Sequence, residues 1–150
     1  MRISARADYA VRAVIELAAA DPQWLKADAI AEAQGIPGKF LEQIMADLRR
    51  AGLVRSRRGV DGGYSLARPA SEVAVADVIR AVDGPLAWVR DQRPAAVEYA
   101  GNAEPLRDVW VAVRAALRSV LDSVTIADIL ADSLPAEITE LNESEDAWRD

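Results

Sequence analysis

The stretch VRSRRGVDGGYSLARP, residues 54–69, decides how the rest of the chain is interpreted. It holds four arginines and three glycines around one aromatic residue, Tyr64. Its central segment RGVDGG contains adjacent glycines, which allow positive φ angles and a close approach of the backbone. Short strand-like runs, Leu53-Val54 and Tyr64-Ser65-Leu66, flank that segment. The sequence therefore predicts a β-hairpin.

This hairpin is basic although the whole chain is acidic. The 150 residues include 18 Lys and Arg against 24 Asp and Glu, a net charge of −6. Residues 1–70 carry 11 basic and 8 acidic side chains, whereas residues 71–150 carry 7 and 16. Within residues 49–68, six arginines accompany a single acid, Asp61, so the local charge is +5. Such a cluster suits phosphate groups, and a solvated charged hairpin is the alternative.

Two helices are predicted ahead of the hairpin. Ser4 is a suitable N-cap, and apolar residues recur at helical spacing after it, which predicts an amphipathic helix over residues 4–20. The run LKADAIAEAQG, residues 25–35, predicts a short second helix. It should end at Gly35, because glycine readily adopts the left-handed conformation found after helix C-termini.

A third helix is predicted over residues 38–51, after the tight turn Ile36-Pro37-Gly38. Leu41, Ile44 and Leu48 share one face of this helix and should point into the core. Its outer face should then expose polar side chains. These are Lys39, Glu42, Gln43, Asp47 and Arg50.

The order helix, short helix, tight turn, helix and basic hairpin is that of a winged helix-turn-helix domain. We therefore expect a mainly α fold with a small β-hairpin wing and a long C-terminal helix. In this fold the third helix enters the major groove of DNA. The wing lies beside it and directs arginines to phosphates or into the minor groove.

Three stretches also resemble one family of bacterial transcription regulators, the Rrf2 (IscR-like) family. They are MRISARADYAVRAVIELA, IAEAQGIPGKFLEQIMADLRRAGLVRSRRGVDGGYSLARP and VAVADVIRAVDGPL, and the similarity covers roughly residues 1–87. In that family the start of the recognition helix and a wing arginine contact DNA. The resemblance thus implicates Lys39, Glu42, Gln43 and Arg58. Together with their neighbours, the predicted DNA-binding residues are Lys39, Phe40, Glu42, Gln43, Arg50, Arg55, Arg57, Arg58, Gly59, Gly62, Gly63 and Tyr64.

The chemistry of these residues suits base recognition. Glu42 can accept from a cytosine amino group, Gln43 can pair with an adenine edge, and Lys39 can bind a phosphate. Phe40 matches an aromatic position of the family, although a packing role explains it equally well. Asp61 departs from the glycine- and proline-rich wing of the family, and its charge near phosphates would weaken the wing contacts unless a neighbouring arginine offsets it.

The chain contains no cysteine and no histidine. Sensory members of the family hold an iron-sulfur cluster through three cysteines between the fourth and fifth helices. Here residues 91–105, DQRPAAVEYAGNAEP, occupy that place, and carboxylates alone do not hold such clusters. We expect no metal, no cofactor and no redox sensing. We also expect no enzymatic activity, since thiol and imidazole chemistry is excluded and the remaining polar residues show no catalytic spacing.

The second half of the chain contains a long apolar pattern that the DNA-binding region does not explain. From Leu106 onward, apolar residues recur every three or four positions, which predicts a helix of about 18 residues with an apolar stripe. Packing back onto its own domain is one interpretation of this stripe, and dimerisation is the one we favour. The predicted dimerisation residues are Leu106, Val109, Trp110, Val113, Leu117, Val120, Leu121 and Val124.

The remaining segments complete the expected organisation. TIAD, residues 125–128, resembles a capping box that begins a short helix, and residues 136–150, with six acids and one arginine, should form a frayed tail. We divide the chain into a DNA-binding domain, residues 1–87, and a second part, residues 88–150, with the loop, dimerisation helix and acidic tail. The four tryptophans are best explained by packing, and only Trp88, beside the loop, leaves an effector contact open.

Together these features predict a homodimeric, sequence-specific DNA-binding regulator, a repressor that binds a palindromic operator. A small-molecule effector or a partner protein would act at the loop of residues 91–105. The alternative is a protein-interaction adaptor that keeps the winged-helix scaffold and works through its acidic C-terminal half. No apolar run reaches the roughly 20 residues of a membrane span, and the N-terminus does not resemble a signal peptide, so we expect a cytoplasmic protein.

Overall fold

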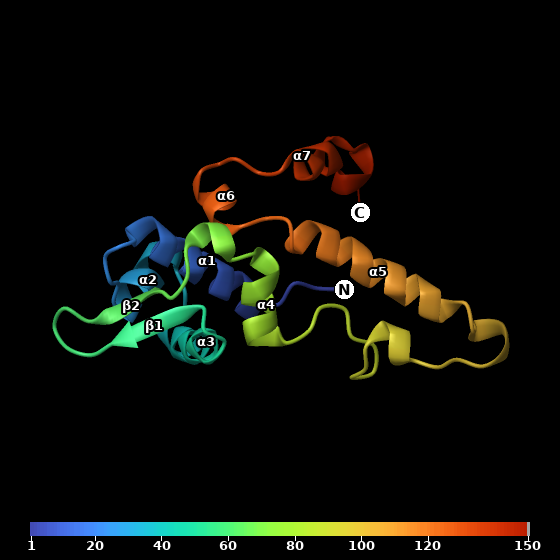
Figure 1. The fold of residues 1–150 in the computed structure, drawn as a ribbon, viewed down its shortest axis with the longest axis horizontal. Helices are drawn as coiled ribbons and strands as arrows, with labels where there is room; N and C mark the ends of the chain where they lie inside the picture. The colour runs from blue at the N-terminus through green and yellow to red at the C-terminus, as the bar shows by residue number, and fades with distance from the viewer. Residues whose placement is uncertain (150) are drawn as a thin grey trace.

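The computed structural model describes residues 1–149 and shows a mainly helical chain with one β-hairpin (Figure 1). Four short 3-10 turns join or extend the regular elements: η1 (Ala70–Glu72), η2 (Pro94–Ala96), η3 (Gly101–Ala103) and η4 (Glu145–Trp148). The helices and strands are α1 (Ala5–Ala20), α2 (Ala27–Gln34), α3 (Gly38–Arg50), β1 (Val54–Arg57), β2 (Gly63–Leu66), α4 (Val75–Asp83), α5 (Leu106–Leu121), α6 (Ile126–Leu130) and α7 (Ala136–Glu143).

The first three helices begin and end close to the residues predicted from the sequence. The Ser4 hydroxyl accepts a hydrogen bond from the Ala7 amide at 2.9 Å, which caps α1. Gly35 follows α2 with φ = 62°, the left-handed conformation expected of it. The inner face of α3 is buried as predicted, with Leu41, Ile44 and Leu48 at 1% exposure or less.

The core lies among α1, α2, α3 and the hairpin. Leu17 of α1 and Ile30 of α2 are buried in one cluster with the inner face of α3, and Val54 and Leu66 close it from the hairpin. These two residues are paired in the antiparallel register of β1 and β2, so they share a face. The winged helix-turn-helix arrangement predicted from the sequence is confirmed.

Helix α6 returns to this core from far along the chain. The segments that lead into α4 and α6 form an antiparallel bridge, in which Val75 N donates to Val124 O and Ile126 N donates to Val73 O, both at 2.9 Å. Ile126 is fully buried in the main cluster. We call α1–α4, the hairpin and α6 the body. The division of the chain at residue 87 stays a prediction, and Ile126 is one contact that crosses it.

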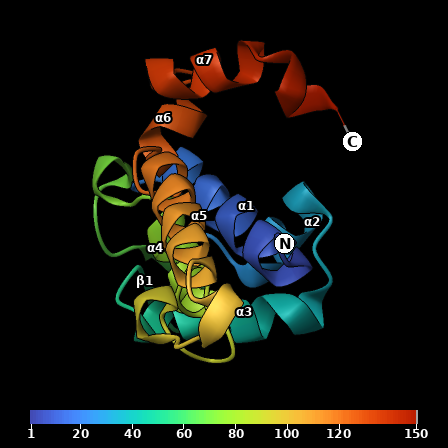
Figure 2. The same ribbon diagram turned by 90° about the vertical axis from the view of Figure 1, so that its right-hand side faces the viewer.

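Helix α5 forms an arm that extends away from the body, with residues 84–105 folded back beside it (Figure 1). Figure 2 looks nearly along its axis, so α5 is seen projecting in front of α4. None of its sixteen residues is buried. The turn η2 packs against one side of the arm, and the Trp110 indole donates a hydrogen bond to the Tyr99 hydroxyl at 3.0 Å.

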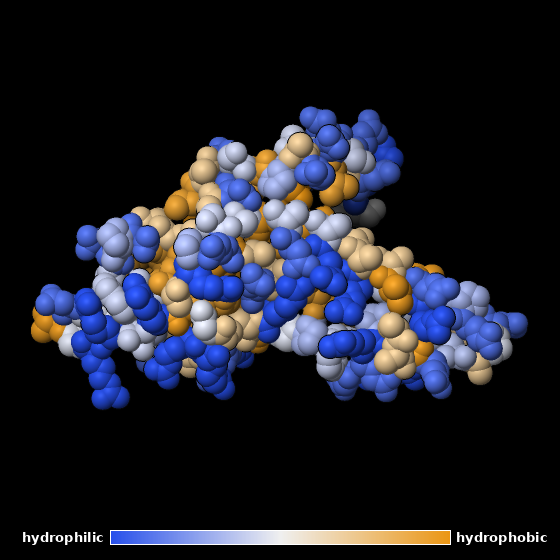
Figure 3. All heavy atoms as spheres, viewed as in Figure 1, coloured by the Kyte–Doolittle hydropathy of each residue, from blue (hydrophilic) through white to orange (hydrophobic). Residues whose placement is uncertain are grey.

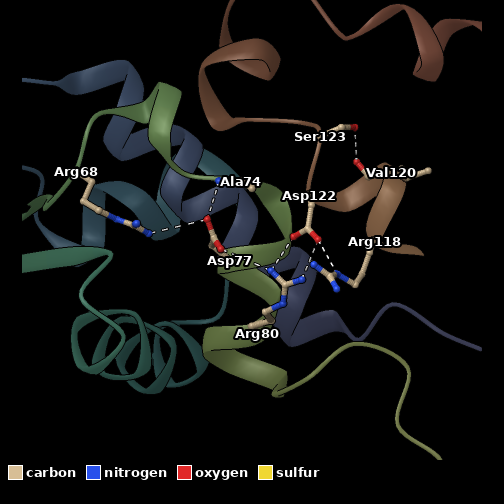
Figure 4. Close-up of polar contacts among 8 residues, drawn as sticks. All are labelled: Arg68, Ala74, Asp77, Arg80, Arg118, Val120, Asp122 and Ser123. Atoms are coloured by element: carbon tan, nitrogen blue, oxygen red, sulfur yellow. Dashed lines mark hydrogen bonds and ion pairs between the residues drawn. The ribbon is translucent and has the colours of Figure 1, made fainter. Parts of the chain in front are cut away.

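An ion-pair network joins the C-terminal end of the arm to α4 (Figure 4). The Asp122 carboxylate forms ion pairs with the guanidinium of Arg80 at 2.7 Å and with that of Arg118 at 3.0 Å. The hydrogen bond from Arg80 lowers the pKa of the Asp122 carboxyl; desolvation opposes this shift, and the Arg118 hydrogen bond adds to it. Asp77 lies 3.6 Å from Arg80 and 4.0 Å from Arg68, so the charges alternate from the end of the hairpin to the end of α5.

The C-terminal segment is more ordered than the sequence suggested. Thr125 and Asp128 exchange hydrogen bonds as the predicted capping box requires. The expectation of a frayed tail is wrong for α7 and η4, which are both helical. Ser144 caps η4 by accepting from the Asp146 amide at 3.3 Å, and the Trp148 indole of η4 donates to Asn142 O of α7 at 2.7 Å. Side chains along this segment are nevertheless largely exposed. Within residues 1–149, no helix is long and apolar enough to cross a membrane.

Candidate nucleic-acid interface

The start of α3 presents the three predicted contact residues to solvent. Lys39, Glu42 and Gln43 are all exposed. Phe40 lies among them, 48% exposed, with its ring centroid 6.3 Å from that of Tyr9 and 5.2 Å from the Lys39 ammonium. Phe40 therefore packs on α1 with one part of its ring and leaves another part exposed.

Further along α3, Asp47 is not the solvated residue that the helical pattern predicted. Its side chain is only 12% exposed because Arg6 of α1 reaches across to pair with it. Arg50 pairs with the same carboxylate, and Gln43 donates to it at 3.3 Å. This expectation was wrong because helical periodicity shows which residues share a face but not which side chain of another helix covers that face. Arg50 thus shares an acidic partner with Arg6 and carries less free charge toward DNA.

The two arginines of β1, Arg55 and Arg57, lie on the same face of the hairpin. Arg55 and Arg57 alternate with Ser56 along β1, so their side chains lie on the opposite face from Ser56. Ser56 accepts a hydrogen bond at 3.3 Å from Arg49, in the last turn of α3. Arg55 and Arg57 instead lie over the Trp24 ring, in the connection between α1 and α2.

Among residues 1–149, Arg58 differs from Arg55 and Arg57 in having no partner for its side chain. It is exposed and makes no ion pair, side-chain hydrogen bond or aromatic contact with any other residue of 1–149. Arg57, by comparison, donates to Asp61 O at 2.6 Å, which occupies it within the turn. Asp61 itself makes no ion pair within the described chain, so its carboxylate stays a negative charge near the tip of the wing.

The wing glycines shape the turn more than they present a surface. Gly62 is buried, and its amide donates to Gly59 O at 3.1 Å. Gly63 has φ = 132°, and a Cβ there would clash with the carbonyl oxygen of Leu25, so only glycine fits. Tyr64 is half-buried, and its backbone pairs with Leu25 in both directions, at 2.7 and 2.9 Å. A DNA contact from Gly62, Gly63 or Tyr64 stays a prediction.

Lys39, Glu42, Gln43 and Arg58 thus lie on the exterior of adjacent elements of the body. Figure 3 shows strongly hydrophilic side chains over α3 and β1, whereas the outermost tip of the wing is hydrophobic, where Val60 is 93% exposed. Sequence reasoning missed the side chains that organise this surface: Arg6 beside α3, and Trp24 and Lys26 beside the wing. No local signal marks them, because each acts through a residue distant in sequence.

A family model agrees with this geometry. The model for Rrf2, described as iron-dependent transcriptional regulator, matches residues 3–132. The chain belongs to the Rrf2 family. Rv1287 of Mycobacterium tuberculosis, which bears the name of an HTH-type transcriptional regulator, is 51% identical to this Rrf2 protein over 142 residues, covering 94% of this chain and 88% of the relative.

Solved structures of Rrf2 relatives share the fold over most of their length. CymR, the global cysteine regulator of B. subtilis, has a TM-score of 0.73 at 32% identity, covering 89% of this chain and 98% of its own. IscR of T. potens has a TM-score of 0.72 at 35% identity, covering 88% of each chain. The protein is accordingly a winged-helix, DNA-binding transcriptional regulator of the Rrf2 family and not an enzyme.

The iron in the family's description does not fit the side chains of this Rrf2 protein. The sequence has no thiolate and no imidazole, the donors that iron-sulfur clusters require. Among residues 1–149, no three Asp or Glu side chains gather where they could hold a metal ion. The absence of an iron-sulfur cluster stays a prediction.

Proposed function

We propose that this Rrf2 protein is a homodimeric repressor that binds a palindromic operator without an iron-sulfur cluster. The single observation that carries the proposal is the presence of two exposed features on one body: the polar start of α3 and the wing residue Arg58, whose side chain has no partner within residues 1–149. A helix in the major groove and a cation beside it supply base readout and phosphate or minor-groove contact together. Its DNA target would place the protein in the cytoplasm.

Dimerisation is supported by the state of α5. The helix carries the predicted apolar stripe, yet none of its residues is buried within the chain, and Val109 is 51% exposed. Leu117 and Leu121 line an apolar hollow together with Ile79 of α4 and Leu86 of the segment that follows α4. A second α5 would cover the stripe. The two-fold symmetry of such a pair matches a palindromic site.

Val124, the last residue of the predicted stripe, does not belong to the exposed surface of α5. Val124 is 8% exposed and is buried against its own body, where its carbonyl oxygen accepts from Val75 N. The stripe was extended past the end of α5, which the structure places at Leu121. We therefore restrict the proposed dimer surface to Leu106–Leu121.

Regulation is proposed to act at the loop before the arm. Trp88 is 45% exposed and lines an open apolar hollow with Trp110 and Val113 of α5. Three non-glycine residues beside it, Ala87, Arg90 and Asp91, have positive φ angles, a conformation that is held only when the surroundings favour it. A small molecule or a partner protein bound here would change how α5 leaves the body and hence the spacing of the two wings.

Selection of DNA fragments by the purified protein, followed by a salt titration, tests the proposal. We expect a selected duplex with two related half-sites and an affinity that falls steeply with salt, because phosphate contacts release counterions. Sedimentation should show two copies of the chain on each duplex. Absence of any selected duplex would contradict the proposal and favour the adaptor alternative, in which the acidic C-terminal half binds a protein. Unchanged affinity on treatment with dithionite or peroxide is expected without a cluster.

A further inference from the structure

The connection between α1 and α2 lies against the wing and supports it. Trp24 is half-buried, and its ring lies 4.3 Å from the Arg57 guanidinium and 5.2 Å from that of Arg55. A guanidinium within about 6 Å of an indole is attracted to the face of the ring. One tryptophan therefore holds two wing arginines.

Two further contacts join the same connection to the hairpin. Leu25 pairs with Tyr64 through both backbone groups, which forms a single antiparallel bridge at the edge of β2. The Lys26 ammonium donates to the carbonyl oxygen of Gly59, at the tip of the wing. The absence of a side chain at Gly63 allows the backbone of Leu25 to approach β2 closely. Three consecutive residues, 24–26, thus contact the wing along its length.

These contacts leave the wing residues with different degrees of freedom. Arg57 is held between the Trp24 ring and the Asp61 carbonyl oxygen, and Gly59 is held by Lys26. Arg58 lies between these two anchored residues in sequence and is itself unpaired within residues 1–149. The backbone on both sides of Arg58 is therefore restrained while its side chain stays free to reach a ligand.

We propose that Trp24 is a positioning residue for DNA binding, which holds Arg55 and Arg57 so that the wing presents Arg58 to the duplex. This inference rests on the proposed DNA-binding function. A preorganised wing loses less conformational freedom when it binds than a mobile one, and this raises affinity without a direct contact. Trp24 acts through the arginines and not by touching DNA, since it stacks on the face of the hairpin opposite Ser56 and α3.

The test uses a duplex selected by the wild-type protein from a random-sequence library. Trp24→Leu removes the aromatic ring but keeps an apolar side chain, and Trp24→Phe keeps a smaller ring. We expect Trp24→Leu to weaken binding roughly fivefold to tenfold, the scale of one or two cation–π contacts, and Trp24→Phe to weaken it less. Trp148→Leu is the matched control, because Trp148 is 79% exposed at the far end of the chain, and it should bind as the wild type does.

A second comparison separates positioning from general destabilisation. In an Arg58→Ala background, Trp24→Leu should cost little further affinity, because the residue that Trp24 positions is already gone. Thermal unfolding of each variant shows whether the body stays folded. Wild-type affinity for Trp24→Leu, or the same loss with and without Arg58, would overturn the inference. Failure of the wild-type protein to select any duplex would instead count against the proposed function.

Discussion

The body and the α5 arm of this protein differ in how far their apolar side chains are buried. In the body, residues such as Leu17, Ile30 and Ile126 are buried at 1% exposure or less. In the arm, an equally regular apolar pattern leaves every residue of α5 at least partly exposed, and apolar residues reach the surface along it (Figure 3). The same helical periodicity thus describes a closed core in the body and an uncovered apolar surface on the arm, which is why we propose that the arm forms the dimer interface.

The largest expected effect is on assembly. Replacing both Val113 and Leu117 with lysine should convert a dimer to monomer or make the protein insoluble, because unpaired charges are not tolerated in an apolar interface. Sedimentation measures the outcome. Ser119→Lys adds a lysine at an exposed position of the same helix and is the matched control. A wild-type protein that sediments as a monomer would break the contrast between body and arm.

The next effect concerns whether α6 belongs to the body. Ile126→Ala should reduce the free energy of unfolding by about 2–5 kcal/mol, as expected when a fully buried side chain leaves a cavity. Leu130→Ala, on the same helix but 46% exposed, is the control and should change stability little. Denaturant unfolding provides the measurement. Equal effects of the two substitutions would show that α6 is only loosely attached.

The wing should affect binding and leave folding unchanged. Arg58→Ala should weaken binding to the selected duplex by about 1–3 kcal/mol if it makes a good groove contact, with stability nearly unchanged because its side chain has no partner in the body. Lys39→Ala should weaken binding to specific and to non-specific DNA about equally, as expected when a phosphate contact is lost. Fluorescence titration with both kinds of duplex distinguishes the two. A loss confined to the selected duplex would assign base readout to Lys39.

The smallest effect is expected where arm and body meet. Because Arg80 and Arg118 lower the pKa of Asp122, this carboxyl stabilises the fold above its unfolded pKa of about 3.9, and the contribution is lost as pH falls through its lowered folded pKa. Asp122→Asn should cost about 1 kcal/mol or less at neutral pH, since the pair is partly solvated. The difference from wild type should shrink as the solution is acidified. Glu140→Gln, on the exposed side of α7, serves as the control.

Much of the fold could be predicted because its signals are local. The Ser4 cap, the left-handed Gly35 and the apolar face of α3 each depend on residues within a turn or two of one another, so periodicity and turn chemistry were sufficient. The same holds for the hairpin and for the capping box at Thr125. The exposure of Lys39, Glu42 and Gln43 also follows from the helical pattern alone.

By itself the sequence determined α1–α3, the hairpin and α5 in their order, the basic wing and the absence of thiolate and imidazole ligands. Only the tertiary structure decided which charged residues stay free: Arg6 covers Asp47, and Trp24 holds Arg57, whereas Arg58 has no partner in the described chain. It likewise decided that Ile126 completes a core whose other members lie far earlier in the sequence. The physical reason is that periodicity specifies which face of an element is apolar or charged, while the partner of that face depends on how distant elements pack together.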